Sequence, residues 1–266
     1  MSQWLDIEGK TVIVTGGSSG IGLSIVKELL GLGVKVANFD LHEVDLEHDN
    51  YLFHTVDVTD QEQVEKAVND TVEAFGGLDG LVNNAGINIP ALLVDKKEPH
   101  SQYELNDRVF DLMVNVNLKG FYYVAQAATR IFVEQESGVL INMASEAGLE
   151  GSEGQSVYAA TKAAVYSFTR SWAKELGHYN VRAVGLAPGI MEETGLRTLE
   201  YEERLSYTRG ITVDELRAGY SKTSTTPLGR SGKLDEVAST VAFMLSDKAG
   251  YITGVTLNIA GGKTRG

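Results

Sequence analysis

The hydrophobic residues of this chain form short continuous runs that alternate with longer segments in which they recur every three or four positions. The first run, residues 10–15, is rich in β-branched side chains and predicts a strand. The segment after it predicts a helix, because apolar residues at this spacing gather on one helix face. These residues are Ile21, Leu23, Ile25, Val26, Leu29 and Leu30. The alternation continues to the end of the chain and predicts an α/β protein.

The same pattern predicts the later elements. Further strands are expected over residues 34–39, 51–58, 78–83, 139–143, 181–187 and 255–259. Helices are expected from a capping Asp60 to about residue 75, from about 105 to 133, from 156 to a terminating glycine at 177, and over 235–245. In a sheet of this kind ligands bind beyond the carboxyl ends of the strands. The residues discussed below follow such strand ends.

Length and composition narrow the class of protein. At 266 residues the chain can form one domain with a sizeable core, and it carries no repeat or proline-rich linker. Cysteine is absent, which excludes disulfides and thiolate metal sites, and we expect no metal. We expect neither a signal peptide nor a membrane-spanning helix, because the first residues lack a basic and an apolar region and no apolar run is long enough to cross a bilayer. A net charge of −13 disfavours nucleic acid and anionic membranes as partners, so we expect a soluble cytoplasmic protein.

A glycine-rich turn joins the first predicted strand to the first predicted helix. Glycine lets the backbone approach a ligand, and the helix N-terminus offers free N–H groups and a positive dipole end to a pyrophosphate. Glycine also serves ordinary turns, but the order strand, turn, helix favours a dinucleotide site. The residues expected to contact this cofactor are Gly16, Ser18, Ser19, Gly20, Ile21 and Gly22.

The second predicted strand ends at Asp40, close to the distance from the glycine turn at which a carboxylate binds the adenosine ribose. Its charge would repel the 2′-phosphate of NADP. The turn contains no arginine or lysine, and Leu41 follows the aspartate. We therefore expect NAD as the cofactor. The alternative is an aspartate that only starts a turn at the end of the strand.

Tyr158 and Lys162 stand four residues apart in a predicted helix, which places both side chains on one face. A phenol with its ordinary pKa of about 10 is a poor base at neutral pH, and an ammonium close by favours the phenolate. Such a tyrosine can take a proton from an alcohol or return one to a carbonyl oxygen. Pairs at this spacing also decorate solvated helices, so other residues must support the interpretation.

That support comes from short motifs in order along nearly the whole chain. They are Thr15-Gly16-Gly17-Ser18-Ser19-Gly20-Ile21-Gly22, Asp57-Val58, Asn83-Asn84-Ala85-Gly86, Val116-Asn117-Leu118-Lys119-Gly120, Ser145, the Tyr158–Lys162 pair and Pro188-Gly189-Ile190. Together they resemble the short-chain dehydrogenase/reductase family. The resemblance implies a single doubly wound (Rossmann) domain over residues 1–266, with a parallel seven-stranded sheet and helices on both faces.

The resemblance also implies a role for each motif. Tyr158 would be the acid/base, and Ser145 would hydrogen-bond the substrate oxygen. Lys162 would bind the nicotinamide ribose and lower the pKa of Tyr158, and Asn117 would hold a water in a proton relay. Ser145 as a turn residue and Asn117 as a helix kink are the structural alternatives. Further cofactor contacts are implied for Asp57, Val58, Asn84, Ala85, Gly86, Tyr158, Lys162, Pro188, Gly189 and Ile190. A homotetramer is implied as well, with the helices of Asn117 and Tyr158 at one interface.

Substrate specificity is expected in residues 188–233, where basic and acidic residues balance and no anion site stands out. An arginine here could bind a phosphate bidentately, but any single one can equally belong to an ordinary solvated face. The candidates are Arg197, Arg204, Arg209, Arg217, Lys222, Arg230 and Lys233 in this segment, with Lys96, Lys97, Lys263 and Arg265 elsewhere.

Within the family, residues 189–192, 225–233 and 261–266 resemble members that act on polyol phosphates. This implies NAD-linked interconversion of a polyol phosphate and a ketose phosphate, specifically D-sorbitol 6-phosphate and D-fructose 6-phosphate. One alternative is another enzyme of the family, such as a 3-oxoacyl reductase or an unphosphorylated polyol dehydrogenase. Another is a non-catalytic NAD(H)-sensing regulator. Asp40 counts against reductive biosynthesis with NADP, and an intact catalytic set counts against the regulator.

Two segments depart from the usual family pattern. Thr194 follows Pro188-Gly189 one residue later than in the common arrangement, which puts a cofactor role for it in doubt. Residues 87–107 form a longer and more polar stretch than usual, which predicts a distinctive rim for the substrate pocket.

Overall fold

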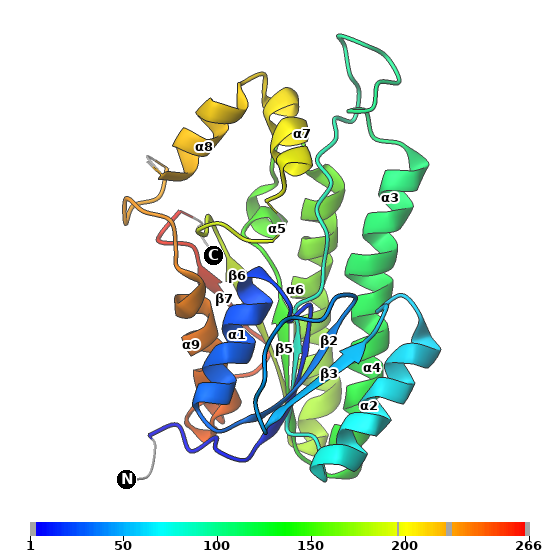
Figure 1. The fold of residues 1–266 in the computed structure, drawn as a ribbon, viewed down its shortest axis with the longest axis vertical. Helices are drawn as coiled ribbons and strands as arrows, with labels where there is room; N and C mark the ends of the chain where they lie inside the picture. Colours follow the sequence, from blue (N-terminus) through cyan, green and yellow to red (C-terminus); the bar gives the residue numbers. More distant parts are fainter. Residues whose placement is uncertain (1–3, 196, 222–224, 264–266) are drawn as a thin grey trace.

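The computed structural model describes residues 4–195, 197–221 and 225–263; Lys222 and Arg265, two of the basic candidates, lie outside these ranges. Parallel strands form one sheet in the order β3-β2-β1-β4-β5-β6-β7 (Figure 1). Their bounds are β1 Thr11–Thr15, β2 Lys35–Asp40, β3 Tyr51–Thr55, β4 Gly80–Asn83, β5 Gly138–Met143, β6 Val181–Pro188 and β7 Thr256–Ile259. The predicted fold class, a single Rossmann-type domain with a parallel seven-stranded sheet, is confirmed.

Helices cover both faces of the sheet. Helices α1 and α9 pack on one face around a core that includes Ile25 and Val241, while α2, α4 and α6 pack on the other around Phe132 (Figure 1). The main helices are α1 Gly20–Gly31, α2 Gln61–Phe75, α3 Asp107–Val114, α4 Phe121–Glu134, α6 Ser156–Leu176 and α9 Leu234–Leu245. Shorter ones are α5 Ala147–Glu150, α7 Leu199–Arg209 and α8 Val213–Ser221, with 3₁₀ turns at Gly177–Tyr179 and Asp247–Ala249.

The order of the strands explains where ligands can bind. β1 lies between β2 and β4, so the chain leaves the centre of the sheet in opposite directions on its two sides. A crevice opens at such a reversal, beyond the carboxyl ends of the strands. The strands β1 and β5 are buried along their full length, as expected for a sheet covered on both faces. The core therefore fixes the strand ends from which the site residues project.

Two predicted elements need correction. The strand expected over 51–58 ends at Thr55, because its neighbour β2 ends at Asp40, the residue with which Thr55 pairs. The helix expected from about 105 to 133 is interrupted by a π-helical turn, Asn115–Gly120, between α3 and α4. π-Helical turns inside α-helices are frequent at functional sites. The interruption lies at Asn117, one of the predicted catalytic residues.

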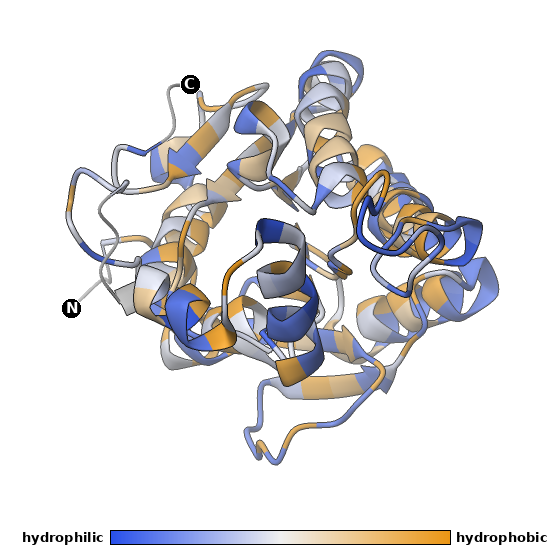
Figure 2. Cartoon of the chain, turned by 90° about the horizontal axis from the view of Figure 1, so that it is seen from above, coloured by the Kyte–Doolittle hydropathy of each residue, from blue (hydrophilic) through white to orange (hydrophobic). Residues whose placement is uncertain are grey.

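The loop between β4 and α3 and the helix α7 meet above the carboxyl ends of the strands (Figure 1). The rings of Tyr103 and Tyr207 stack with centroids 3.9 Å apart, and the Tyr207 hydroxyl donates to Asp95 Oδ2 at 2.7 Å. The Arg204 guanidinium donates to the carbonyl oxygen of Gln102 at 2.8 Å. Seen from above, these outer elements carry many hydrophilic residues, whereas the strands beneath are largely hydrophobic (Figure 2). The long polar segment predicted as a pocket rim thus holds α7 in place.

Candidate active site

The glycine-rich turn between β1 and α1 is held by neighbouring strands. Gly16 has a φ of +66°, which favours glycine. A Cβ at Gly22 would collide with the carbonyl oxygen of Gly16. The N–H of Gly17 donates to Asn38 Oδ1 at 3.0 Å, and Asn84 Nδ2 donates to the carbonyl oxygens of Thr15 and Gly16 at 3.0 and 3.2 Å. The turn is therefore a tightly packed backbone cradle, in which Gly17 and Gly22 have no room for a side chain.

A cavity of about 280 Å³ lies against this cradle. The predicted cofactor residues that line it are Gly16, Ser19, Gly20, Ile21, Gly22, Asp40, Asp57, Val58, Asn84, Ala85 and Gly86. Ser18 lies just behind the lining, where its N–H donates to Asp40 Oδ2 at 3.0 Å and its hydroxyl accepts from Asn38 Nδ2 at 2.9 Å. Among the described residues that line the cavity, the ionisable ones are Asp40 and Asp57.

The shape and donor set of this cavity fit a dinucleotide. Glycine backbone lines the cavity, and α1 begins there at Gly20 with no acidic residue in its first turn. A pyrophosphate is stabilised by such a helix N-terminus. Asp40 accepts N–H groups from Ser18 and His42, at 3.0 and 3.2 Å, which fixes the carboxylate at the end of β2.

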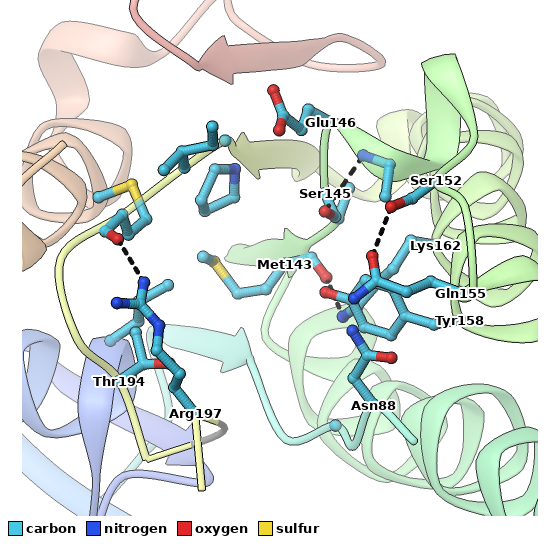
Figure 3. Close-up of a pocket in the computed structure, with 18 of the residues that line it drawn as sticks. Asn88, Met143, Ser145, Glu146, Ser152, Gln155, Tyr158, Lys162, Thr194 and Arg197 are labelled. Atoms are coloured by element: carbon cyan, nitrogen blue, oxygen red, sulfur yellow. Dashed lines mark hydrogen bonds between the residues drawn. The ribbon is translucent and has the colours of Figure 1, made fainter. Parts of the chain in front are cut away.

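A second cavity, of about 270 Å³, adjoins the first and is lined by Ser145, Tyr158 and Lys162 (Figure 3). Asn117, the fourth predicted catalytic residue, is not among the residues that line either cavity. The two cavities share Ile21, Asn84, Gly86 and Thr194. Ser145, which follows β5, and Tyr158 and Lys162, which lie on α6, line the second cavity together with Pro188, Gly189 and Ile190 after β6. The structure therefore brings the predicted reacting residues to the border between the two cavities.

Tyr158 and Ser145 line the same cavity, and Ser145 is close enough to influence the pKa of the Tyr158 hydroxyl. Burial raises the pKa of Tyr158 above its usual value, the side chain of Ser145 lowers it, and the carboxylate of Glu146 raises it. The loop of Ser145 is fixed by two contacts: its Oγ accepts the N–H of Ala147 at 3.3 Å, and its carbonyl oxygen accepts the Tyr166 hydroxyl at 3.1 Å. Ser145 is thus also the turn residue of the alternative interpretation, and the two roles are compatible.

Lys162 lies near Tyr158 on α6, and its predicted effect on the pKa of Tyr158 stays a prediction. Its Nζ donates to the carbonyl oxygen of Met143 at 2.7 Å and lies 5.9 Å from the centre of the Tyr158 ring. Burial lowers the pKa of Lys162 to about 8, so its amine is still mostly protonated at neutral pH.

Asn117 sits in the π-helical turn with both ends of its amide engaged. Oδ1 accepts the N–H of Ile87, and Nδ2 donates to the carbonyl oxygen of the same residue, each at 2.8 Å. Nδ2 also lies 3.2 Å from the hydroxyl of Thr161, the residue before Lys162. Asn117 therefore links the loop after β4 to α6. It also lies in the π-helical turn, as in the alternative interpretation of a helix kink.

Several residues of the two cavities were missed by the sequence interpretation. Thr194 lines both cavities, in spite of its late position, because the chain after β6 folds back over the glycine turn. Asn38 is fully buried, and its side chain accepts a hydrogen bond from the N–H of Gly17. In the sequence this role could have been suspected from an amide residue inside an otherwise apolar strand. Glu146 lies 2.6 Å from Lys263, and Gln155 Nε2 donates to the Tyr201 hydroxyl at 2.8 Å. These last contacts join residues that are far apart in the sequence, so no local sequence pattern predicts them.

Within the described part of the chain, no group of three or more histidine, cysteine or carboxylate residues could hold a metal ion. None of the helices in that part is both long and apolar enough to cross a membrane.

Comparison with known proteins places the chain in a family. A profile described as short chain dehydrogenase matches residues 10–205. Sorbitol-6-phosphate 2-dehydrogenase of Klebsiella pneumoniae is 56% identical over 268 residues, covering 100% of both chains. A 3-oxoacyl-[acyl-carrier-protein] reductase of Thermotoga maritima is 34% identical, over 96% of this chain and 98% of its own.

Solved structures agree with this placement. Ligand-free aldohexose dehydrogenase of Thermoplasma acidophilum superposes with a TM-score of 0.84 at 28% identity, covering 98% of this chain and 96% of its own. Levodione reductase gives a TM-score of 0.82 at 31% identity, with 97% and 98% covered. The chain is therefore an oxidoreductase that acts on CH–OH groups with NAD or NADP, and it belongs to the short-chain dehydrogenase/reductase family.

Proposed function

We propose that this enzyme interconverts a polyol phosphate and a ketose phosphate, specifically D-sorbitol 6-phosphate and D-fructose 6-phosphate, with NAD as the cofactor. The observation that carries the proposal is the 56% identity, along both entire chains, to sorbitol-6-phosphate 2-dehydrogenase of Klebsiella pneumoniae. The pocket beside Tyr158 supports it, because polar and charged side chains such as Glu146, Gln155 and Arg209 line its wall. A polyhydroxylated substrate can hydrogen-bond to such a wall, whereas an acyl chain cannot.

The preference for NAD rests on charge. Asp40 and Asp57 are the ionisable residues that line the cofactor cavity in the described part of the chain, and both are acids. A carboxylate at the end of β2 can accept hydrogen bonds from the ribose hydroxyls and repels a 2′-phosphate. A phosphorylated substrate and NAD are both found in the cytoplasm, where we expect the enzyme to act.

The side chains of the second cavity suit the proton chemistry of this reaction. A bound nicotinamide dinucleotide supplies the two-electron acceptor for the alcohol. Tyr158 accepts the hydroxyl proton in the oxidising direction, and Ser145, which lines the same cavity, orients the substrate oxygen. Lys162 lies on the next turn of α6, where we expect it to hold the nicotinamide ribose. Asn117 holds the backbone of Ile87 beside Lys162, where a water can continue the proton relay.

The assay that tests the proposal follows NADH formation with three substrates: sorbitol 6-phosphate, sorbitol and a 3-hydroxyacyl thioester. We expect the highest kcat/KM with sorbitol 6-phosphate and a preference for NAD over NADP. Equal or higher kcat/KM with sorbitol would indicate an unphosphorylated polyol dehydrogenase. A preference for the thioester would indicate a 3-oxoacyl reductase, the activity named for the relative at 34% identity. Inactivity with all three, together with tight NADH binding, would support the non-catalytic regulator.

We further propose a homotetramer in which α4 and α6 contribute to one interface. Phe110, Leu112 and Tyr122 expose large apolar side chains on the α3–α4 segment. Exposed apolar patches of this kind mark interaction surfaces. Light scattering coupled to size-exclusion chromatography should give about four times the mass of the chain, and a monomeric mass would refute the proposal.

A further inference from the structure

Among the described residues, four cations line the substrate pocket: Lys162, Arg197, Arg209 and Lys263. Two of them already have strong partners. Lys162 donates to the carbonyl oxygen of Met143 at 2.7 Å, and Lys263 forms an ion pair with Glu146 at 2.6 Å. Arg197 and Arg209 are therefore the two cations left for a substrate anion.

The other arginines of residues 188–233 are paired with carboxylates and do not line the pocket. Arg204 lies 3.1 Å from Glu200, while Arg217 and Arg230 each lie 2.6 Å from a glutamate. Among the described residues, none of the ion pairs includes Arg197 or Arg209. These three arginines thus pair with glutamates outside the pocket, while Arg197 and Arg209, which line it, form no ion pair in the described part of the chain.

Arg197 and Arg209 differ in how firmly they are held. The guanidinium of Arg197 stacks on the ring of Tyr220, 3.7 Å from its centroid, and donates to the carbonyl oxygen of Met191 at 2.9 Å. It faces Gln155 and Tyr158 from across the pocket, beside Thr194 (Figure 3). Arg209 makes one long contact, at 3.3 Å, to the hydroxyl of Ser152. A guanidinium has five N–H donors, so most donors of Arg209 are available.

A chain of hydrogen bonds leads from Arg209 toward the catalytic tyrosine. Ser152 Oγ donates to Gln155 Oε1 at 2.6 Å, and Gln155 Nε2 donates to the Tyr201 hydroxyl at 2.8 Å. Gln155 lies three residues before Tyr158, about 4.5 Å along the axis of α6. Arg209 thus lies at the far end of a polar wall that starts one helical turn from Tyr158. A sugar chain held by its second carbon at Tyr158 would extend along this wall.

We propose that Arg209, together with the hydroxyl of Ser152, binds the phosphate of the substrate. The inference rests on the proposed polyol phosphate activity and assigns the residue that recognises the phosphorylated end. Arginine binds phosphate through two parallel N–H donors, which suits a side chain with a single weak partner. The positive end of the α6 dipole adds to the attraction, because the helix begins at Ser156 and no side chain caps it. Glu150, on the same wall, is exposed and is screened by solvent.

The test compares Arg209→Gln, Arg209→Lys and two matched variants, Arg197→Gln and Arg230→Gln, with sorbitol 6-phosphate and sorbitol as substrates. In Arg209→Gln the ratio of kcat/KM for the two substrates should fall about 10- to 100-fold, mainly through a higher KM for sorbitol 6-phosphate. Arg209→Lys should recover part of the ratio, since lysine keeps the positive charge but lacks the paired N–H donors of the guanidinium. Arg230 pairs with Glu236 outside the pocket, so Arg230→Gln should keep the wild-type ratio.

Each outcome separates this inference from the proposed function. A wild-type enzyme that does not prefer sorbitol 6-phosphate over sorbitol would refute the function itself. A wild-type preference that persists in Arg209→Gln, or that is lost in Arg197→Gln instead, would refute only the assignment of Arg209. NADH binding and thermal unfolding of each variant show whether the fold is intact, and Arg209→Lys replaces Arg209→Gln as the decisive variant if the latter does not fold.

Discussion

The two cavities of this enzyme are built in different ways. The cofactor cavity is formed mainly by short segments that follow β1, β2, β3 and β4. The hydrogen bonds that fix its glycine turn join backbone groups to the side chains of Asn38, Asp40 and Asn84. The substrate pocket takes its wall from the α5–α6 loop, α7, α8 and the C-terminal segment, and its contacts join side chains that are far apart in the sequence. Ser152 and Arg209, for example, are 57 residues apart.

This difference reflects the two ligands: the cofactor is common to all members of the family, whereas the substrate differs from one enzyme to another. A dinucleotide is the same in every member, so a cradle fixed by strand ends serves them all. The substrate differs, and loops and short helices placed on a rigid scaffold can change without disturbing it. If the two cavities are independent, substitutions in the substrate pocket should leave cofactor binding unchanged. Substitutions in the cofactor cavity should leave the substrate preference unchanged.

The largest expected effect is at the border of the two cavities. Tyr158→Phe removes the acid/base hydroxyl and should lower kcat about 10³-fold, because no other group can take the alcohol proton. NADH binding, followed by fluorescence, should stay within about twofold, since the phenyl ring preserves the shape of the site. Tyr179→Phe, at an exposed tyrosine, is the control and should keep full activity. Near-normal turnover in Tyr158→Phe would exclude the assigned role.

A smaller effect is expected at the end of β2. Asp40→Ala removes the carboxylate that lines the cofactor cavity and should raise the KM for NAD about tenfold, while the ratio of NADP to NAD activity rises. The preference for sorbitol 6-phosphate over sorbitol should not change. Asp45→Ala, at an exposed aspartate of the following loop, is the matched control. An unchanged cofactor preference would mean that Asp40 only shapes the turn.

The sequence was sufficient for most of the sheet and for the cofactor cavity, because both depend on local patterns. Alternating apolar runs and helical periodicity marked the strands, and Asp60 caps α2 as expected, accepting the N–H groups of Glu62 and Gln63. The failures occurred where distant contacts decide the geometry. The sequence did not predict the hydrogen bond of Lys162 to the carbonyl oxygen of Met143, 19 residues away. Neither this bond nor the pairing of Glu146 with Lys263, 117 residues away, is visible in a sequence pattern.

The same limit applied to the phosphate candidates. The sequence offered many basic residues in 188–233 as candidates to bind the phosphate. It could not show which of them form ion pairs with acidic residues in the folded chain. The Arg204–Glu200 pair follows the i,i+4 rule and was foreseeable, whereas Arg217 and Glu202 lie 15 residues apart on different helices. Only the folded structure shows that Arg209, unlike these arginines, lines the pocket and forms no ion pair among the described residues.

The smallest expected effect concerns the rim that holds α7. Tyr207→Phe removes the hydrogen bond to Asp95 and should lower Tm by about 2 °C, with NADH binding unaffected. The hydrogen bonds from Ser101 and Tyr207 lower the pKa of Asp95 from 3.8 to about 2. The charged carboxylate therefore stabilises the fold above its unfolded pKa, and this contribution disappears as the pH falls toward 2.

Asp95→Asn isolates that contribution. The Tm of the wild type should exceed that of Asp95→Asn by a margin that is constant near neutral pH and shrinks as the pH falls from about 4 toward 2. Asp49→Asn, at an exposed aspartate outside the rim, should show no such change of margin. A margin independent of pH would mean that the ionised carboxylate of Asp95 does not hold the rim. If NADH affinity fell along with the margin, the rim and the cofactor cradle would not be independent, and the division between the two cavities would fail.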